Sequence, residues 1–293
     1  MTPAVTPSET PVPRTPSPVV ELVDERAARR GLRLFLKRDD LVHPELPGNK
    51  WRKLRHNIGP AREHGTLLTF GGAYSNHIRA VASAGRLHGF ATIGVIRGEE
   101  HLPLNGTLAH AERMGMRLAY MDRSTYRRKH EPDVVEALRE RWGAFYLLPE
   151  GGSNARAVRG CAELGAEAAG FDVVCCPCGT GGTLAGLAAG LGPGQRALGF
   201  SVLKGGFMTA EVERLQRETY GGRRGDWSVE DGFHFGGYAR ATPELDAFAA
   251  DFARRHGVVL DRVYTAKMMF GVLALADRGA FPAGVRILAV VTG

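Results

Sequence analysis

Short apolar runs alternate with longer helix-like segments along almost the whole chain of 293 residues. The runs that we expect to form strands cover residues 33–37, 66–70, 91–96, 117–121, 144–148, 172–176, 197–203 and 287–291. The expected helices cover 49–57, 75–87, 105–114, 133–141, 154–169, 183–191, 210–219, 242–256 and 266–277. Because strands separated by helices of this length are joined by parallel βαβ crossovers, this order predicts an α/β protein.

The pattern favours two three-layer α/β/α units. The apolar strands near the two ends of the chain predict one mainly parallel sheet, and the amphipathic middle predicts a second one. A chain that starts one sheet, builds another and then returns to the first leaves a cleft between them, where small molecules often bind. Residues 1–15 are rich in Pro, Thr and Ser and lack periodicity, so we expect a disordered lead-in.

Composition narrows the function classes. Hydrophobic residues make up 44% and charged residues 24% of the chain, as in ordinary globular proteins. No apolar run approaches the roughly 20 residues of a membrane helix, and no signal peptide is visible, so we expect a soluble, cytoplasmic protein without a membrane partner. The net charge of +7 includes no basic run with interleaved aromatic residues, which argues against a nucleic-acid partner. The cysteines lack the second pair that a zinc site requires, so we expect buried thiols and no metal.

A lysine stands at the start of an expected helix. Lys50 follows a turn at Gly48 and Asn49, where the positive end of the helix dipole disfavours a cation. That field, combined with burial, would lower the pKa of the amine and make it a better nucleophile toward an aldehyde. The alternative is that Lys50 and Lys53 are two ordinary solvated lysines.

Two glycine-containing turns come between a strand and a helix. The first, residues 71–77, ends in Ser75 and Asn76 and would present backbone donors, a hydroxyl and an amide; the alternative is a helix N-cap without a ligand. The second, Gly179–Thr183, would bring N–H groups and positive potential close to an anion. It matches neither the dinucleotide fingerprint nor the nucleotide P-loop, so it predicts a phosphate that belongs to neither NAD nor ATP.

Hydroxyl residues follow expected strand ends in the C-terminal part, at Tyr238, Tyr264, Thr265 and Thr292. Open α/β sheets bind ligands beyond the carboxyl ends of their strands, although each tyrosine alone fits a core or rim position equally well. One ligand would bind to the lysine, to both glycine-containing turns and to these hydroxyl residues. Pyridoxal phosphate needs an amine for its aldehyde, a cup for its phosphate, and partners for its ring oxygen and ring nitrogen.

The chain resembles the pyridoxal-phosphate enzymes of the tryptophan-synthase β-like fold (fold type II), specifically the aminocyclopropanecarboxylate deaminase and D-cysteine desulfhydrase family. The resemblance covers residue 16 to the end and rests on stretches that occur in the family's order. They are Lys37-Arg38-Asp39-Asp40-Leu41, Gly48-Asn49-Lys50 with Arg52-Lys53, Gly71-Gly72 with Ser75-Asn76-His77, Gly151-Gly152-Ser153-Asn154, Gly179-Thr180-Gly181-Gly182-Thr183-Leu184-Ala185-Gly186, Val263-Tyr264-Thr265 with Lys267, and Thr292-Gly293.

The resemblance implies a role for each candidate residue. Lys50 would form the Schiff base with the cofactor, Asn76 would bind its ring oxygen, and Ser75 would contact the substrate carboxylate or act near the α-carbon. The phosphate would bind backbone N–H groups of Gly179, Thr180, Gly181, Gly182 and Thr183, and Tyr238 and Tyr264 match the family's two active-site tyrosines. The family fold implies a large cofactor domain from 16–58 and 155–293, a small inserted domain at 59–154, and a homodimer.

Two positions indicate the type of reaction. Family deaminases have a glutamate at the position of Thr265 and a leucine at that of Thr292, whereas both residues are threonine here, as in the desulfhydrases. We therefore expect a lyase that eliminates a β-substituent from an amino acid, giving pyruvate, ammonia and, from D-cysteine, sulfide. The alternatives are aminocyclopropanecarboxylate deamination to 2-oxobutyrate and a non-catalytic homologue that binds the cofactor or an amino acid. The chain stops at Thr292-Gly293, where the family continues.

Overall fold

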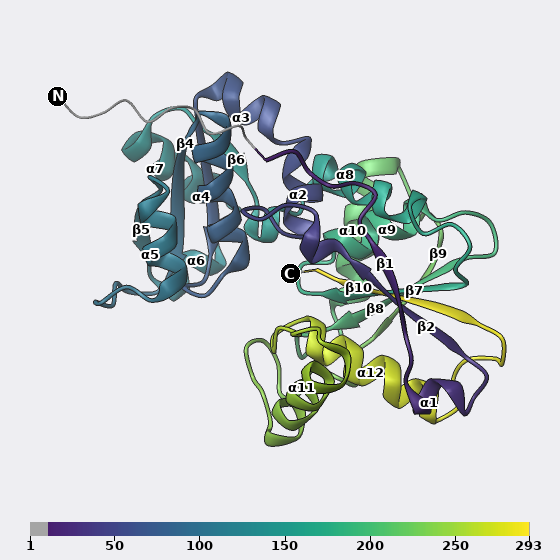
Figure 1. Cartoon of the computed structure of the whole chain (residues 1–293). Helices are drawn as coiled ribbons and strands as arrows, with labels where there is room; N and C mark the ends of the chain where they lie inside the picture. The colour runs from purple at the N-terminus through teal and green to yellow at the C-terminus, as the bar shows by residue number, and fades with distance from the viewer. Residues whose placement is uncertain (1–10, 293) are drawn as a thin grey trace.

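The computed structural model describes residues 11–292 and arranges their strands in two separate sheets (Figure 1). Of the predicted lead-in, residues 1–10 lie outside the described part, and residues 11–15 form no helix or strand. Every strand pair is parallel except the one between the first two strands. The predicted α/β class with two mainly parallel sheets is thereby confirmed.

The larger sheet joins both ends of the chain. Its six strands, in spatial order, are β1 (Val19–Leu22), β2 (Arg33–Arg38), β10 (Arg286–Val291), β7 (Val173–Cys178), β8 (Arg196–Ser201) and β9 (Asp226–Glu230). The last strand of the chain, β10, lies between β2 and β7 and pairs with both in parallel. Segments separated by more than 130 residues in sequence therefore form one sheet.

Helices cover both faces of the larger sheet. One face carries α1 (Glu25–Ala28), α11 (Pro243–His256) and α12 (Thr265–Asp277), and the other carries α8 (Ala155–Ala166), α9 (Gly182–Gly190) and α10 (Met208–Tyr220). All six residues of β7 are buried. Val173 and Cys175 pack in the first apolar cluster, whereas Val174 and Cys176 pack in the second. This alternation explains why the strand is a continuous apolar run.

The smaller sheet has the strand order β5 (Arg117–Met121), β4 (Ala91–Arg97), β3 (Thr66–Gly71) and β6 (Tyr146–Leu148). Its helices are α3 (Ile58–His64), α4 (Asn76–His88) and α5 (Gly106–Arg113) on one face, and α6 (Arg123–Arg127) and α7 (Pro132–Trp142) on the other. Helix α2 (Asn49–Arg55) lies between the two sheets in Figure 1. The domain limits 16–58, 59–154 and 155–293 stay a prediction.

The described residues contain neither a membrane-spanning helix nor a cluster of metal ligands. Between residues 11 and 292, no helix combines the length and the apolar character that a bilayer-spanning segment needs. The same residues contain no group of three or more His, Cys, Asp or Glu side chains placed to bind one metal ion. All four cysteines are buried and unpaired as thiols.

Candidate active site

A cleft between the two sheets brings together residues from both. Among the predicted site residues, its lining includes Lys50, Ser75, Asn76, Gly179, Thr180, Gly181, Thr183, Tyr238, Tyr264 and Thr292. Gly182 and Thr265 do not line it. Segments that are far apart in sequence therefore meet at one place, beyond the carboxyl ends of the parallel strands, as the strand order of an open sheet requires.

The glycine-rich turn between β7 and α9 forms one wall. Gly181 has a left-handed φ of 71°, and the turn leaves the N–H groups of Gly179, Thr180 and Gly181 without a partner among residues 11–292. Helix α9 begins at Gly182, so the positive end of its dipole faces the same wall. These donors are arranged for an anion.

A buried ammonium group supports the same turn. The Nζ atom of Lys53 donates to the carbonyl of Gly151 at 3.0 Å and to Ser153 Oγ at 3.0 Å, and it lies 3.4 Å from Thr180 Oγ1. All three partners are neutral, although Lys53 is only 3% exposed. Burial lowers the pKa of Lys53. A negatively charged group bound at the turn would therefore meet the ammonium group of Lys53, which has no anionic partner among the described residues.

Helix α2 presents Lys50 to the cleft through two contacts at its start. Gly48 has a φ of +59°, and a Cβ atom there would lie 1.8 Å from the carbonyl oxygen of Thr292. Only glycine permits this close approach to the end of β10. The next residue, Asn49, donates from Nδ2 to Thr183 Oγ1 at 3.0 Å, which ties the start of α2 to the start of α9.

The amine of Lys50 is chemically unusual. Burial, followed by the charge of the nearby Lys53, lowers its pKa from 10.5 to about 7. The side chain is half-buried because its outer part faces the cleft, while protein surrounds the rest. Near neutral pH a large fraction of Lys50 therefore carries the free electron pair that attack on an aldehyde requires.

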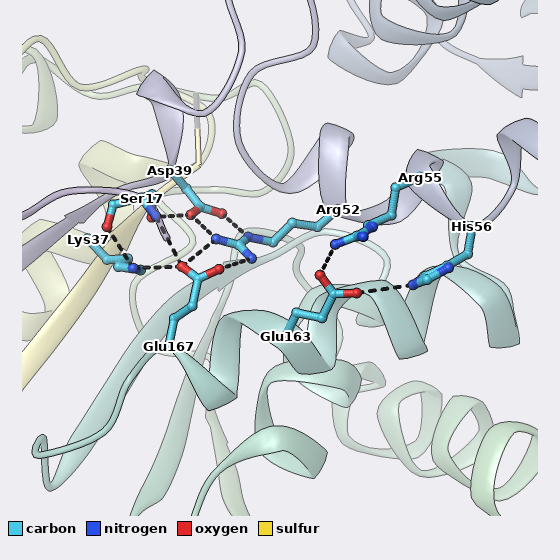
Figure 2. A network of polar contacts seen from close by, with 8 residues as sticks. All are labelled: Ser17, Lys37, Asp39, Arg52, Arg55, His56, Glu163 and Glu167. Carbon is cyan, nitrogen blue, oxygen red and sulfur yellow. Dashed lines mark hydrogen bonds and ion pairs between the residues drawn. The ribbon is translucent and has the colours of Figure 1, made fainter. Parts of the chain in front are cut away.

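A network of charged side chains fixes α2 against the larger sheet, as Figure 2 shows. Arg52, which is 1% exposed, donates to both oxygens of Asp39 at 2.8 Å and to both oxygens of Glu167 at 2.8 and 2.9 Å. Lys37 reaches the same Glu167 at 2.8 Å. Burial alone would raise the pKa of Glu167, but the bonds from Arg52 and Lys37 outweigh it and hold that pKa below its ordinary value.

The far end of the same helix is held by a third carboxylate. Arg55 and His56 both contact Glu163 of α8 (Figure 2). Charged contacts therefore lie within six residues of Lys50 on its C-terminal side, and contacts to Glu163 and Glu167 set the direction of α2. Such a frame holds a reactive amine in one position.

The opposite wall comes from the smaller sheet. Ser75 caps α4, since its Oγ accepts from the N–H of Ile78 at 3.4 Å. The N–H groups of Asn76 and His77 have no partner among residues 11–292. The first turn of α4 therefore offers two backbone donors, the amide of Asn76 and a helix dipole to a second anion in the cleft.

His77 has one defined tautomer. Thr69 donates its hydroxyl proton to the carbonyl of Leu148 at 2.8 Å, so the 2.8 Å contact between Thr69 Oγ1 and His77 Nε2 requires that Nε2 carries the proton. The Nδ1 atom is buried without a partner. Burial, and then the charges of Lys50 and Lys53, lower the pKa of His77 well below its ordinary value, so the ring is neutral.

Two tyrosines close the cleft on the side of the larger sheet. The rings of Tyr238 and Tyr264 meet edge to face, with centroids 6.0 Å apart. Burial, and then the neighbouring Tyr238, raise the pKa of Tyr264 well above its ordinary value, so its hydroxyl keeps the proton. Thr265 points elsewhere, because its hydroxyl donates to Asp261 Oδ2 at 2.6 Å.

The residues present fit pyridoxal phosphate. The unpartnered N–H groups of the Gly179–Gly181 turn and the ammonium group of Lys53 match a phosphate dianion. The amine of Lys50, with its pKa of about 7, matches an aldehyde carbon. Three independent features of one cleft thus agree with the cofactor that the sequence predicts.

Several lining residues were not among the predicted site residues. Lys53, His77 and Gly151 belong to stretches that carry the resemblance, so a signal for them existed. Arg97 and Glu150 gave no signal for a binding role. Arg97 is the last residue of β4, and only the placement of the smaller sheet brings it to the cleft.

Comparisons with known proteins agree with this geometry. The family model described as "Pyridoxal-phosphate dependent enzyme" matches residues 11–293. A Pyrococcus furiosus protein, provisionally named 1-aminocyclopropane-1-carboxylate deaminase, is 32% identical over 98% of this chain and 90% of its own. The D-cysteine desulfhydrase of Yersinia enterocolitica is 30% identical over 90% and 87%. A crystal structure of an "ACC deaminase homologue" superposes with a TM-score of 0.82 at 29% identity, covering 97% of this chain and 91% of the other.

Proposed function

Because the chain belongs to the pyridoxal-phosphate-dependent enzymes, in the family of aminocyclopropanecarboxylate deaminases and D-cysteine desulfhydrases, we propose that it eliminates a β-substituent from an amino acid. With D-cysteine the products are pyruvate, ammonia and sulfide. The observation that carries the choice is Thr292, which lines the cleft with a neutral hydroxyl where the deaminases have a leucine. The other diagnostic position, Thr265, is also neutral, and its hydroxyl is bound to Asp261.

The absence of a carboxylate on this side of the cleft matters for the chemistry. Among residues 11–292, the one carboxylate that lines the cleft is Glu150, which comes from the smaller domain. A carboxylate beside the ring nitrogen would keep it protonated, which opening of an unactivated cyclopropane ring needs. Expulsion of a thiolate or another good leaving group needs less stabilisation of the carbanion, so a protonated ring nitrogen is less important. The lack of a lining carboxylate among the described residues on the side of the larger sheet therefore supports elimination over ring opening.

Each wall of the cleft has a task in the proposed reaction. When bound, pyridoxal phosphate supplies an electron sink for the pair that the departing α-proton leaves behind. The Gly179–Thr183 turn and Lys53 bind the phosphate. The first turn of α4, with Ser75 and Asn76, orients the substrate carboxylate and the ring oxygen. Binding at these two walls fixes the α-carbon between them.

The proton transfers fall to two residues. Lys50 takes the α-proton at Nζ, and its pKa near 7 makes the amine a competent base at neutral pH. Tyr264 retains its own proton and is a donor rather than a base. The leaving group departs from the β-carbon with its bonding electron pair, and water completes conversion to the keto acid and ammonia.

The test is turnover by the holoenzyme with D-cysteine, L-cysteine, β-chloro-D-alanine and aminocyclopropanecarboxylate, with sulfide, pyruvate and 2-oxobutyrate measured. We expect pyruvate, together with sulfide from cysteine, and no 2-oxobutyrate. A Lys50→Ala variant should lose both turnover and the visible absorbance of the bound cofactor. Release of 2-oxobutyrate would instead establish the deaminase activity. The absence of turnover across a panel of D- and L-amino acids would establish a non-catalytic homologue. The proposed homodimer is tested by light scattering.

A further inference from the structure

A guanidinium group stands at the substrate side of the cleft. Arg97 ends β4 opposite Met121 of β5, and the N–H of Gly98 donates to the Met121 carbonyl at 2.7 Å, so the backbone at this point is fixed. The side chain lines the cleft. Its Nη2 atom lies 3.7 Å from where a Cβ of Gly72 would be, and its Cζ atom lies 5.9 Å from the ring centre of Tyr126.

Arg97 has no counter-ion of its own. Within residues 11–292 this side chain, which is exposed at the mouth of the cleft, forms neither an ion pair nor a hydrogen bond. Glu150, the carboxylate of the cleft lining, is already engaged: Lys129 Nζ lies 3.1 Å from Oε2, and the Tyr126 hydroxyl donates to Oε1 at 2.9 Å. Glu150 is therefore bound by Lys129 and Tyr126, and the guanidinium group of Arg97 remains available to bind an anionic ligand.

The other positive groups of the cleft have separate tasks. Lys53 lies beneath the glycine-rich turn, and Lys50 provides the reactive amine. The first turn of α4 offers its unpartnered N–H groups to the substrate carboxylate. Arg97 is thus a cation in addition to those that the cofactor phosphate and one carboxylate require. It stands beside Tyr126, whose hydroxyl is bound to Glu150.

We propose that Arg97 selects amino acids whose side chain ends in a negatively charged group, which its two-pronged guanidinium binds. This inference rests on the proposed elimination reaction and names its substrate class. With O-phosphoserine, the α-proton passes to Lys50 and the bond between Cβ and oxygen breaks. That bonding pair leaves on phosphate while a carbon–carbon double bond forms. Water then yields pyruvate and ammonia, so no oxidant or reductant is needed.

Binding can be measured separately from turnover. Aspartate and asparagine have the same shape and differ in one charge, so their dissociation constants on the holoenzyme are compared by calorimetry, for both enantiomers. We expect aspartate to bind about tenfold more tightly or better, the value of a charge-assisted hydrogen bond. The Arg97→Gln variant should bring the two constants within about twofold, and Arg97→Lys should restore part of the preference. Arg113→Gln, an exposed position on α5 outside the cleft, is the charge-matched control.

Turnover gives a second readout with another matched pair. O-phosphoserine and O-acetylserine both carry good leaving groups, and only the first is an anion at the side chain. We expect a higher kcat/KM for O-phosphoserine and a loss of that advantage, about tenfold, in Arg97→Gln. An equal loss for both substrates would show that Arg97 binds the α-carboxylate and would overturn the proposal. So would aspartate binding no more tightly than asparagine to an enzyme that retains its cofactor. Failure to retain the cofactor would instead refute the proposed function.

Discussion

The amine of Lys50 offers a quantitative test of how the cleft is built. With a pKa of about 7, half of the molecules carry a neutral amine at pH 7. An ordinary lysine, with a pKa of 10.5, is neutral in roughly one molecule in 3,000 at that pH, because each pH unit is a factor of ten. The reaction of the protein with an aldehyde should therefore be faster by about three orders of magnitude than that of a surface lysine.

The measurement uses the protein freed of cofactor and pyridoxal, which has the aldehyde but lacks the phosphate. The rate at which visible absorbance develops is followed from pH 5 to pH 10, with Lys50→Ala as the baseline. We expect the rate to rise with pH and to level off just above pH 7. Lys53→Met removes the repelling charge, so the pKa of Lys50 should rise and the inflection should move to higher pH. Arg113→Met should leave it in place.

One outcome would refute the reasoning. If the rate keeps rising tenfold per pH unit to pH 9 or beyond, Lys50 is an ordinary solvated lysine and burial does not govern its chemistry. The stability of the cofactor-free protein gives an independent check. Since the unfolded chain binds a proton on this lysine up to about pH 10.5 and the folded chain only to about pH 7, the free energy of unfolding should increase between those values.

Three further outcomes follow from the structure. Arg52→Met leaves the buried Asp39 without its guanidinium partner and the half-buried Glu167 with the ammonium group of Lys37, and it should lower the free energy of unfolding, measured in urea, by about 3–5 kcal/mol; a loss below about 1 kcal/mol would contradict this role. Gly48→Ala cannot keep its φ of +59° or the approach to β10, so the absorbance of bound cofactor should fall, whereas Gly59→Ala in α3, where a Cβ meets nothing, should leave it unchanged. At Asp24, burial would raise the pKa, but bonds from two arginines lower it to about 2. These bonds should add about 2 kcal/mol at pH 7, lost as the pH falls from about 4 to 2; an Asp24→Asn variant should show no such acid-dependent loss in urea unfolding.

Local patterns were sufficient for most of the fold. The continuous apolar run of β7 and the turn that follows it are properties of adjacent residues, so the sequence predicts both. The edge strand β9 is not among the predicted strands. Its apolar Trp227 and Val229 alternate with polar residues, but the alternation covers only five residues and is too short to mark a strand by itself. The predicted helix 49–57 is shorter in the structure. Helix α2 ends at Arg55 with His56 as its C-cap, and Asn57 is the N-cap of the next helix, α3.

The candidate site shows where sequence patterns stop being informative. The glycine-rich turn and Lys50 carry local signals, because a helix start has the same physical properties in any fold. Lys53 has a signal only through the family stretch that contains it, and Arg97 has none. The partners of Lys53 lie 98 to 127 residues away in sequence, and Arg97 owes its importance to ion pairs made by other residues. Such roles depend on the tertiary arrangement of the two sheets and cannot be predicted from neighbouring residues in the sequence.

The position of β10 has a consequence for synthesis of the protein. This strand bridges β2 and β7, and its end supports Gly48 beside Lys50, yet it is synthesised after every other strand of the two sheets. While the ribosome is still translating residues 173–285, the nascent polypeptide already contains every charged group of the cleft but lacks the strand that brings them together. Capture of the vitamin B6 aldehyde therefore requires a polypeptide that extends through β10, and products terminated before residue 286 should remain colourless.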